Sequence, residues 1–566
     1  MKKHYETHVE DTDKLISVAG PVLDYKSWYE QYRKLMEEQA QRKYGLYTPT
    51  SEGDDDDFPS ITGMIARYSA KGLTNEEMSK NPVWKDLTGN GHDLQMKNFA
   101  WKGMSGVGGY GDENYQTFYK FTLDDYVFVA SPPGAKHMNF TFRVTGLQPG
   151  NKLTLAFFGT TNTVYGTWDK DGIYTVDADI VEAGKPTYFY NGYGATRGEF
   201  TIEILPLYPG ALVFDGVDDY GVCENFPILT KEKGYTVVAL RQWITYNPNA
   251  ISAIATNASD QSFNGAFTFE NYNKGAEQTI SYGATQITLQ YSKSPFSWQT
   301  TSKYNGVNIA NGNKDATNSL VLGRSYPQRN EFANFAIWEL VFLDHDATEE
   351  ELTKIKDYFV KTYPWLFPDQ AWTVTGKTNE DEDRATIANI TGNGNDLVLS
   401  NFGFAEGSGY NEEGEYAGYL VTDGVDDKII SSIFKMGNDW TVIGDWELIN
   451  TGKNDNAGIV KFDSIVIYNY NYNSMLINIK NGRNILIPDQ NTVNAICFDG
   501  RIYSKDWKES IYNEETESTS KNFLTIGYSG NAYTKIAFKN LAIYPTGLSR
   551  EDCIKAYNYL QTLKAK

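Results

Sequence analysis

The fold is decided by two short motifs, Asp86-Leu-Thr-Gly-Asn-Gly-His-Asp-Leu94 and Leu212-Val-Phe-Asp-Gly-Val-Asp-Asp-Tyr220. Both recur in the same order, as Asn389-Ile-Thr-Gly-Asn-Gly-Asn-Asp-Leu397 and Leu420-Val-Thr-Asp-Gly-Val-Asp-Asp-Lys428. The Thr-Gly-Asn-Gly and Asp-Gly stretches supply residues that tolerate the positive φ of tight turns between strands. One module therefore occurs twice in the chain.

The spacing of the motifs locates an insertion in the first copy. Thr88 and Thr391 are 303 residues apart, whereas Asp215 and Asp423 are 208 apart, so the first copy contains 95 additional residues. A small β-sandwich has about this size. Within the insertion, residues 140–155 alternate apolar and polar side chains on both sides of a Pro-Gly turn, which predicts two strands.

Composition narrows the class of protein. Aromatic residues make up 14% of the chain, which also contains 50 glycines, and this favours short strands joined by tight turns. The net charge of −21 argues against binding to nucleic acid or to an anionic membrane. Three scattered cysteines, Cys223, Cys497 and Cys553, form neither a disulfide framework nor a paired metal motif.

The N-terminal region differs from the rest of the chain. Ser27-Trp-Tyr-Glu30 predicts a capping box, and the apolar residues after it have helical spacing. We therefore expect a helical segment at 1–50, either attaching the protein to an assembly or packing on the first module. An acidic linker follows at 51–60, then module 1 at 61–365 with an inserted β-sandwich at 116–208, and module 2 at 366–566.

These motifs, together with Phe335-Ala-Ile-Trp-Glu-Leu-Val-Phe342 before a Thr-Glu-Glu helix start, resemble a known family. The sequence resembles the laminin G-like branch of the concanavalin A-like lectin/glucanase superfamily over about two thirds of its length. The resemblance implies a mostly β fold: two antiparallel jelly-roll sandwiches, here with a small inserted immunoglobulin-like sandwich and an N-terminal helical segment.

The resemblance also implies ligands. Members of the family bind sugars or proteins, often with Ca²⁺ at the rim of the sandwich, and some branches hydrolyse glycans. By this analogy the candidate Ca²⁺ ligands are Asp218, Asp219, Asp426 and Asp427, although the same carboxylates can instead bond backbone amides in the hairpin. The Glu-x-Asp-x-x-Glu strand motif of the glucanases is absent from the sequence, so we expect no enzymatic activity.

Two tyrosine-rich segments are candidate glycan-binding surfaces, because sugar CH faces stack on aromatic rings. One contains Tyr188, Tyr190 and Tyr193 in the insertion, and the other contains Tyr468, Tyr470 and Tyr472 in the second module. Alternation in the second segment predicts a strand with one tyrosine face. The same tyrosines could instead belong to a core or an interface.

The first residues, Met1-Lys-Lys-His-Tyr-Glu-Thr-His8, carry charges where a signal peptide needs an apolar run, and no stretch is long and apolar enough to span a membrane. With tandem lectin-like modules, this organisation resembles a fibre or decoration protein of a tailed bacteriophage virion, assembled in the host cytoplasm and released by lysis.

That resemblance implies a homo-oligomer that contacts other virion proteins through its N-terminal segment and presents its sandwiches to bacterial surface polysaccharide. Two alternatives stay open. One is a purely structural virion component, and the other is a bacterial cell-surface glycan-binding protein.

Overall fold

A computed structural model describes residues 57–565 apart from internal stretches, the longest of which are 111–119, 259–267, 273–285, 292–315 and 512–520. The segment 1–50 that was expected to be helical lies outside the described residues, as does most of the acidic linker. Residues Asp57–Lys566 form one compact unit. In the described part of the chain no helix is sufficiently long and apolar to cross a membrane.

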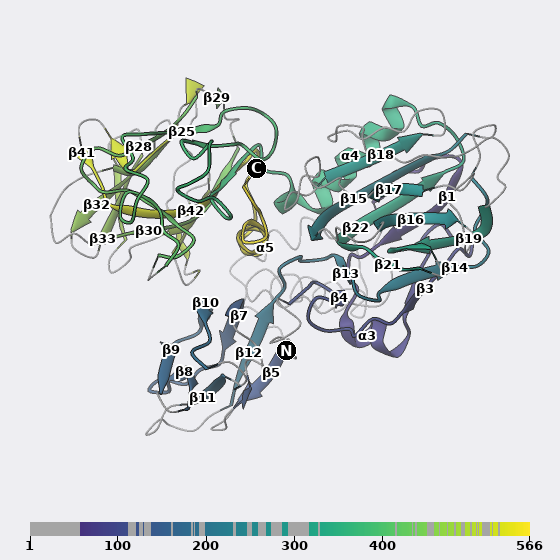
Figure 1. Ribbon diagram of the computed structural model, residues 1–566, viewed down its shortest axis with the longest axis horizontal. Coiled ribbons are helices and arrows are strands. Elements are labelled where there is room, and N and C mark those ends of the chain that lie inside the picture. The colour runs from purple at the N-terminus through teal and green to yellow at the C-terminus, as the bar shows by residue number, and fades with distance from the viewer. Residues whose placement is uncertain are drawn as a thin grey trace, which may run out of the picture. The chain divides into compact units, whose positions relative to one another are not determined.

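Module 1 consists of two antiparallel sheets (Figure 1). The first has the order β18 (Gln286–Tyr291), β15 (Thr236–Thr245), β22 (Asn334–Leu343), β13 (Leu212–Asp215) and β4 (Gly106–Val107), and β1 (Met64–Ser69) also pairs with β22. The second has the order β17 (Thr268–Tyr272), β16 (Ser252–Ala258), β19 (Ala316–Leu322), β14 (Tyr220–Cys223), β3 (Leu94–Lys97) and β2 (Val83–Trp84). A hairpin of β20 (Arg324–Tyr326) and β21 (Arg329–Phe332) follows β19.

Module 2 repeats this strand order. Its first sheet contains β35 (Val493–Cys497), β30 (Thr441–Leu448), β42 (Ile536–Tyr544), β27 (Leu420–Val421) and β26 (Gly409–Tyr410), with β23 (Gln370–Thr373) on β42. Its second sheet contains β32 (Ile465–Asn471), β31 (Gly458–Phe462), β39 (Leu524–Ile526), β28 (Lys428–Ser431), β25 (Leu397–Ser400) and β24 (Thr386–Ile387). The duplicated motifs therefore correspond to a duplicated topology of jelly-roll type.

Additional short strands extend module 2. β36 (Arg501–Ser504) and β37 (Glu509–Ile511) continue its first sheet, and β33 (Ser474–Ile479) and β34 (Arg483–Ile487) continue its second. Two separate pairs are β29 (Phe434–Lys435) with β38 (Lys521–Asn522), and β40 (Tyr528–Ser529) with β41 (Ala532–Tyr533).

The inserted sandwich lies in the chain between β4 and β13. One sheet contains β10 (Gly172–Asp179), β7 (His137–Thr145), β12 (Phe200–Leu205) and β5 (Lys120–Leu123); the other contains β6 (Phe128–Val129), β11 (Tyr188–Asn191), β8 (Leu153–Phe157) and β9 (Thr163–Trp168). The two strands predicted around the Pro-Gly turn are β7 and β8. They belong to different sheets, so this turn crosses from one layer of the sandwich to the other.

The two ends of the insertion are joined by backbone hydrogen bonds. The N–H of Leu207 donates to the carbonyl of Gly109 at 2.7 Å, and the N–H of Tyr208 donates to that of Gly108 at 2.8 Å. In module 2 the equivalent connection is a short turn, closed by a bond of 2.9 Å from the N–H of Asn411 to the carbonyl of Tyr419.

Each module ends in a helix, α4 (Glu349–Thr362) or α5 (Arg550–Leu560). Thr348 and Glu351 form the predicted capping box, with both reciprocal bonds present. Ser549 accepts the N–H of Asp552 at 3.1 Å, but the shorter Asp552 side chain accepts from the serine hydroxyl at 2.7 Å. The other helices in the described part of the chain are α3 (Asn75–Lys80) and the 3-10 turn η3 (Pro364–Leu366).

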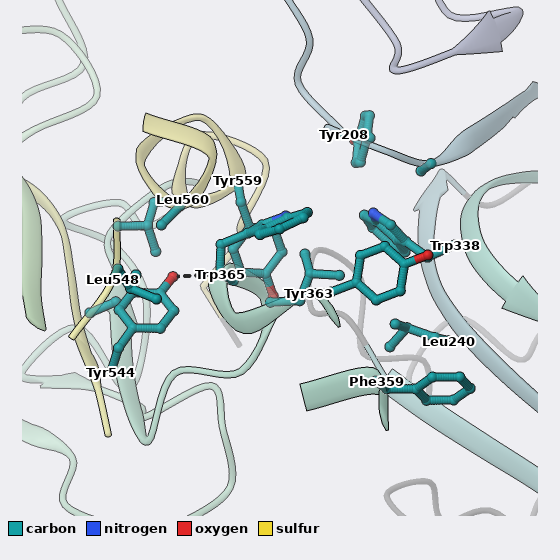
Figure 2. Packing of buried hydrophobic residues seen from close by; sticks show 14 of the residues in the cluster. Tyr208, Leu240, Trp338, Phe359, Tyr363, Trp365, Tyr544, Leu548, Tyr559 and Leu560 are labelled. Carbon is teal, nitrogen blue, oxygen red and sulfur yellow. Dashed lines mark hydrogen bonds between the residues drawn. The ribbon is translucent and has the colours of Figure 1, made fainter. Parts of the chain in front are cut away.

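Each sandwich has its own buried core, and a further cluster contains α4, η3, α5 and the sheet residues that face them. Trp365 of η3 lies close to Tyr559 and Leu560 of α5 and to Tyr363 (Figure 2). Trp338 donates its indole N–H to the carbonyl of Pro209 at 2.9 Å. The segment between the modules is thus part of a packed core.

Candidate functional site

The Asp-rich hairpin of module 1 connects β13 to β14. Asp219 is fully buried. Its Oδ1 accepts from the Ser105 hydroxyl at 2.9 Å, and its Oδ2 accepts from the N–H of Asp215 at 3.0 Å. Asp215 Oδ1 in turn accepts from the N–H groups of Val217 at 2.7 Å and Asp218 at 3.3 Å. These carboxylates hold the hairpin in shape.

The hairpin of module 2 has the same bonds. Asp427 accepts from the Ser408 hydroxyl at 3.1 Å and from the N–H of Asp423 at 2.7 Å. Asp423 accepts from the N–H of Val425 at 2.7 Å. The equivalence of the two hairpins extends to the side chains that stabilise them.

Burial changes the acidity of both inner carboxyls. It raises the pKa of Asp219 to about 8, and the neighbouring charge of Asp215 adds to the effect. Burial likewise raises the pKa of Asp427 to about 6. At neutral pH the two equivalent groups therefore have different tendencies to hold a proton.

The candidate Ca²⁺ ligands are close together in both modules. In each triad, Asp215, Asp218 and Asp219 or Asp423, Asp426 and Asp427, carboxylate oxygens lie within 4.8 Å of one another. Ca²⁺ takes six to eight oxygen ligands, however, and the buried Asp219 already uses both oxygens for hydrogen bonds. The geometry therefore favours backbone capping over metal binding by these carboxylates.

The Thr-Gly-Asn-Gly motif of module 1 also has a structural role. Asp86 Oδ1 accepts from the N–H of Arg67 at 3.1 Å and from the N–H of Thr88 at 3.0 Å. The side-chain amide of Asn90 donates to the carbonyl of Met64 at 3.0 Å. These bonds attach the turn to β1.

Module 2 keeps these bonds with Asn389 in place of Asp86. Asn389 Oδ1 accepts from the N–H of Ala371 and from that of Thr391, both at 3.1 Å. Its amide donates to Gln370 Oε1 at 2.6 Å. The exchange of Asp for Asn is accommodated because the acceptor oxygen is unchanged and the new donor has a partner.

An exposed aromatic face occurs on the inserted sandwich. In β11 the buried Phe189 alternates with half-buried Tyr188 and Tyr190, so the two tyrosines project from the outer surface of the sheet. Phe158, just after β8, is 46% exposed. Its ring centroid lies 6.3 Å from that of Tyr188 and 5.3 Å from that of Tyr190. We call Phe158, Tyr188 and Tyr190 the aromatic patch.

Two threonine hydroxyls lie on the same face, that of the exposed Thr167 and that of the buried Thr154. Thr154 pairs directly with Tyr190 across β8 and β11, and it pairs with Thr167 of β9 on its other side. The two threonine hydroxyl oxygens are 3.3 Å apart. Aromatic rings beside hydrogen-bonding groups are the combination that sugar recognition requires.

The other predicted tyrosines are not brought into this patch by the described structure. Tyr193 and Tyr472 lie outside the described residues. Tyr468 and Tyr470 are in β32, as the alternation predicted, but their side chains lie outside the described part. Phe158 was missed from the sequence because it directly follows the buried Phe157, and only the end of β8 turns it outward.

No family model and no curated protein matches this sequence. Among solved structures, a Trypanosoma rangeli sialidase in complex with sialic acid is 8% identical with a TM-score of 0.26, over 40% of this chain and 40% of that chain. The Botulinum Neurotoxin Type G Receptor Binding Domain is 12% identical with a TM-score of 0.21, over 34% of this chain and 50% of that one.

A truncated AlyQ with CBM32 and alginate lyase domains is 9% identical with a TM-score of 0.17, over 59% of this chain and 91% of that one. The match to the sialidase spans less than half of the sialidase chain. Likenesses of this size assign neither a family nor a function.

Proposed function

We propose that this protein is a non-enzymatic glycan-binding protein and that the aromatic patch of its inserted sandwich holds sugar rings. The observation that carries the proposal is the gathering of Phe158, Tyr188 and Tyr190 on one solvent-exposed sheet face. Burying three rings in the core would have stabilised the fold, so their exposure suggests a binding partner.

The orientation of the rings bears on the shape of the partner. The Phe158 ring plane makes an angle of 34° with that of Tyr188 and 54° with that of Tyr190. Rings tilted in this way do not offer one flat platform. They fit the twisted faces of a single soluble polysaccharide chain better than the surface of a crystalline one.

We further propose that the protein belongs to the virion of a tailed bacteriophage, with bacterial surface polysaccharide as its ligand. The support is the tandem modules and the high negative charge. In this proposal the segment 1–50 binds other virion proteins, and homo-oligomers multiply weak sugar contacts into useful avidity. The second candidate, a purely structural virion protein, would use the aromatic patch as a protein interface.

Binding to a panel of bacterial surface polysaccharides tests the first proposal. The full chain is compared with the double variant Tyr188→Ala/Tyr190→Ala, and Val425→Ala is the matched control because it removes an exposed apolar side chain from another module. If stacking on each tyrosine ring contributes about 1 kcal/mol to binding, the double variant should lose affinity about tenfold or more. The Val425→Ala control should keep the affinity of the wild-type chain.

Undiminished binding by the double variant would place sugar recognition elsewhere. No binding by the wild-type chain to any member of the panel would favour the purely structural candidate. Incubation with each bound polysaccharide, followed by analysis of chain length, tests the absence of enzymatic activity, and the expected result is an unchanged polymer.

A further inference from the structure

A cation lies over a pair of neighbouring aromatic rings at the same place in both modules. In module 1 the Arg324 guanidinium carbon is 5.1 Å from the ring centroid of Tyr220 and 5.4 Å from that of Phe332. Favourable cation–π geometry extends to about 6 Å, so both rings contribute. Arg324 is half-buried and Phe332 is buried, and the centroids of the Tyr220 and Phe332 rings are 6.3 Å apart, so the guanidinium lies beside a pair of neighbouring rings.

In module 2 the cation comes from a different strand. Lys428 Nζ lies 4.9 Å from the ring centroid of Tyr528 and 5.6 Å from that of Tyr533. Lys428 begins β28 as Tyr220 begins β14, and Tyr528 follows Gly527 as Arg324 follows Gly323. The duplicated modules therefore keep a cation beside a pair of aromatic rings but exchange which position carries the charge.

Module 1 has a second cation beside this arrangement. Tyr220 pairs directly with Lys97 across β14 and β3, and Val222 pairs with Gln95. Directly opposed residues point to the same face with Cβ atoms about 4.5–5.5 Å apart. Lys97 and Gln95 are both exposed. Lys97 on β3 and Arg324 on β20 thus both lie beside Tyr220.

Module 2 lacks the second cation. The residue opposite Lys428 is Ser400, and the residue opposite Ile430 is Val398, which is 51% exposed. At this position the face of module 2 is therefore more apolar than that of module 1.

The two cations of module 1 have no anionic partner in the described chain. Neither Lys97 nor Arg324 makes an ion pair or a side-chain hydrogen bond with a described residue, and the Arg324 Nε–H is buried without an acceptor.

We propose that Lys97, Tyr220 and Arg324 form a binding site for a carboxylated saccharide. The planar guanidinium, oriented by its two neighbouring rings, binds the carboxylate of an acidic sugar through its N–H groups. Lys97 supplies the second positive charge, and the exposed edge of the Tyr220 ring contacts the sugar. This site is separate from the aromatic patch and adds a selection for acidic sugars that the patch does not provide.

Calorimetric titration of the full chain tests this site. The ligands are oligogalacturonates, oligomannuronates and sialyllactose, each with a neutral counterpart (the methyl esters and lactose). We expect at least one acidic ligand to bind about tenfold more tightly than its neutral counterpart, because charge-assisted hydrogen bonds are lost on esterification. Inorganic phosphate and acetate at the same concentrations distinguish a saccharide site from a general anion site, and we expect both to compete weakly.

Three variants assign the effect to the proposed residues. Arg324→Gln and Lys97→Gln are each expected to lower affinity for the acidic ligand about tenfold and to reduce its dependence on salt. Lys428→Gln, which removes the equivalent cation of module 2, is expected to leave it unchanged. Arg324→Lys keeps the charge but removes the planar fork, so an intermediate affinity is expected.

Two results would overturn the proposal. One is equal affinity for every acidic ligand and its neutral counterpart, and the other is an equal loss in Lys428→Gln and Arg324→Gln. Thermal unfolding of each variant separates a local effect from misfolding. Tyr188→Ala/Tyr190→Ala is expected to retain the acidic preference, so failure at the aromatic patch and failure at this site give different patterns.

Discussion

Tyr544 Oη donates a hydrogen bond of 2.9 Å to the main-chain carbonyl of Trp365 (Figure 2). The bond joins the last strand of module 2 to the segment that leads into it. The Trp365 ring is also covered by Lys555 of α5, whose Nζ lies 4.3 Å from the ring centroid. The segment 364–368 begins and ends with proline. It is held through its backbone, at the Trp365 carbonyl, and through the Trp365 side chain.

Replacing Trp365 tests the contribution of this segment. Trp365→Ala removes a large side chain that is 6% exposed, and we expect a loss of about 3–5 kcal/mol in the free energy of unfolding. Tyr544→Phe, which removes only the hydrogen bond, is expected to cost about 1–3 kcal/mol because it leaves a buried carbonyl without this partner. Denaturant unfolding measures both, and equal costs would contradict the packing role of Trp365.

A buried ionic cluster in module 1 provides a second prediction. Glu339 accepts from the hydroxyls of Ser69 and Tyr363, both at 2.7 Å, and Arg67 Nε lies 3.4 Å from its other oxygen. Glu339→Ala would leave the buried Arg67 without this carboxylate, and the expected cost is about 3–5 kcal/mol in unfolding free energy.

Module 2 contains the matched control for that variant. Asn540 pairs with Thr373 as Glu339 pairs with Ser69, and its buried side-chain amide has no hydrogen-bond partner in the described chain. Asn540→Ala is expected to cost less than about 1 kcal/mol, because removing an unsatisfied amide offsets the lost packing. A cost comparable to that of Glu339→Ala would show that Asn540 has a partner of its own.

The raised pKa of Asp427, about 6, predicts a pH effect on stability. The folded state holds this proton more tightly than the unfolded state, where the pKa is near 3.8, so the contribution of Asp427 to stability is complete below about pH 4 and is lost as pH rises through 6. Asp427→Asn removes that dependence. Relative to wild type, the variant should gain roughly 2–3 kcal/mol between pH 4 and pH 7.5.

Unfolding curves at the two pH values check this prediction, and an unchanged difference between variant and wild type would contradict it. Asp219→Asn is the equivalent change in module 1. Since burial raises the pKa of Asp219 to about 8, its dependence on pH should extend to a higher range than that of Asp427.

Calcium gives a fourth prediction. Because hydrogen bonds already use both oxygens of Asp219 and both of Asp427, millimolar Ca²⁺ is expected to leave the Tm of the wild-type chain unchanged. A scan with Ca²⁺ and with chelator measures this. A rise in Tm that disappears in Asp218→Asn or Asp426→Asn would establish the metal site that the family resemblance implies.

Much of the topology could be predicted because turn residues mark where strands end. The Gly-containing motifs occupy positions that need left-handed backbone, such as Gly216 and Gly424, both at φ 75°, and they recur at matching places in both modules. The hydrogen bonding of Asp219 agrees with the backbone-capping interpretation. The Ca²⁺ interpretation depended on a family analogy rather than on the residues themselves.

The remaining features depend on contacts between distant strands. Arg324 and Tyr220 are more than a hundred residues apart in the chain, and only the pairing of β14 with β19 brings them together. Lys97 becomes their neighbour through a separate register on β3. The pattern of a single strand contains no information on such registers. The sequence therefore showed neither the contact of Arg324 with Tyr220 nor the placement of the module 2 cation at Lys428.

The backbone bonds from Leu207 to Gly109 and from Tyr208 to Gly108 bring the entry and exit of the inserted sandwich side by side. The same edge in module 2 is closed by a short turn. A single site on this architecture therefore accepts either a turn or an entire domain, because both meet the module at two adjacent points. If the inserted domain binds glycan as proposed, its exchange would alter the ligand while the jelly roll that carries it stays intact, so ligand range could diversify faster than the scaffold.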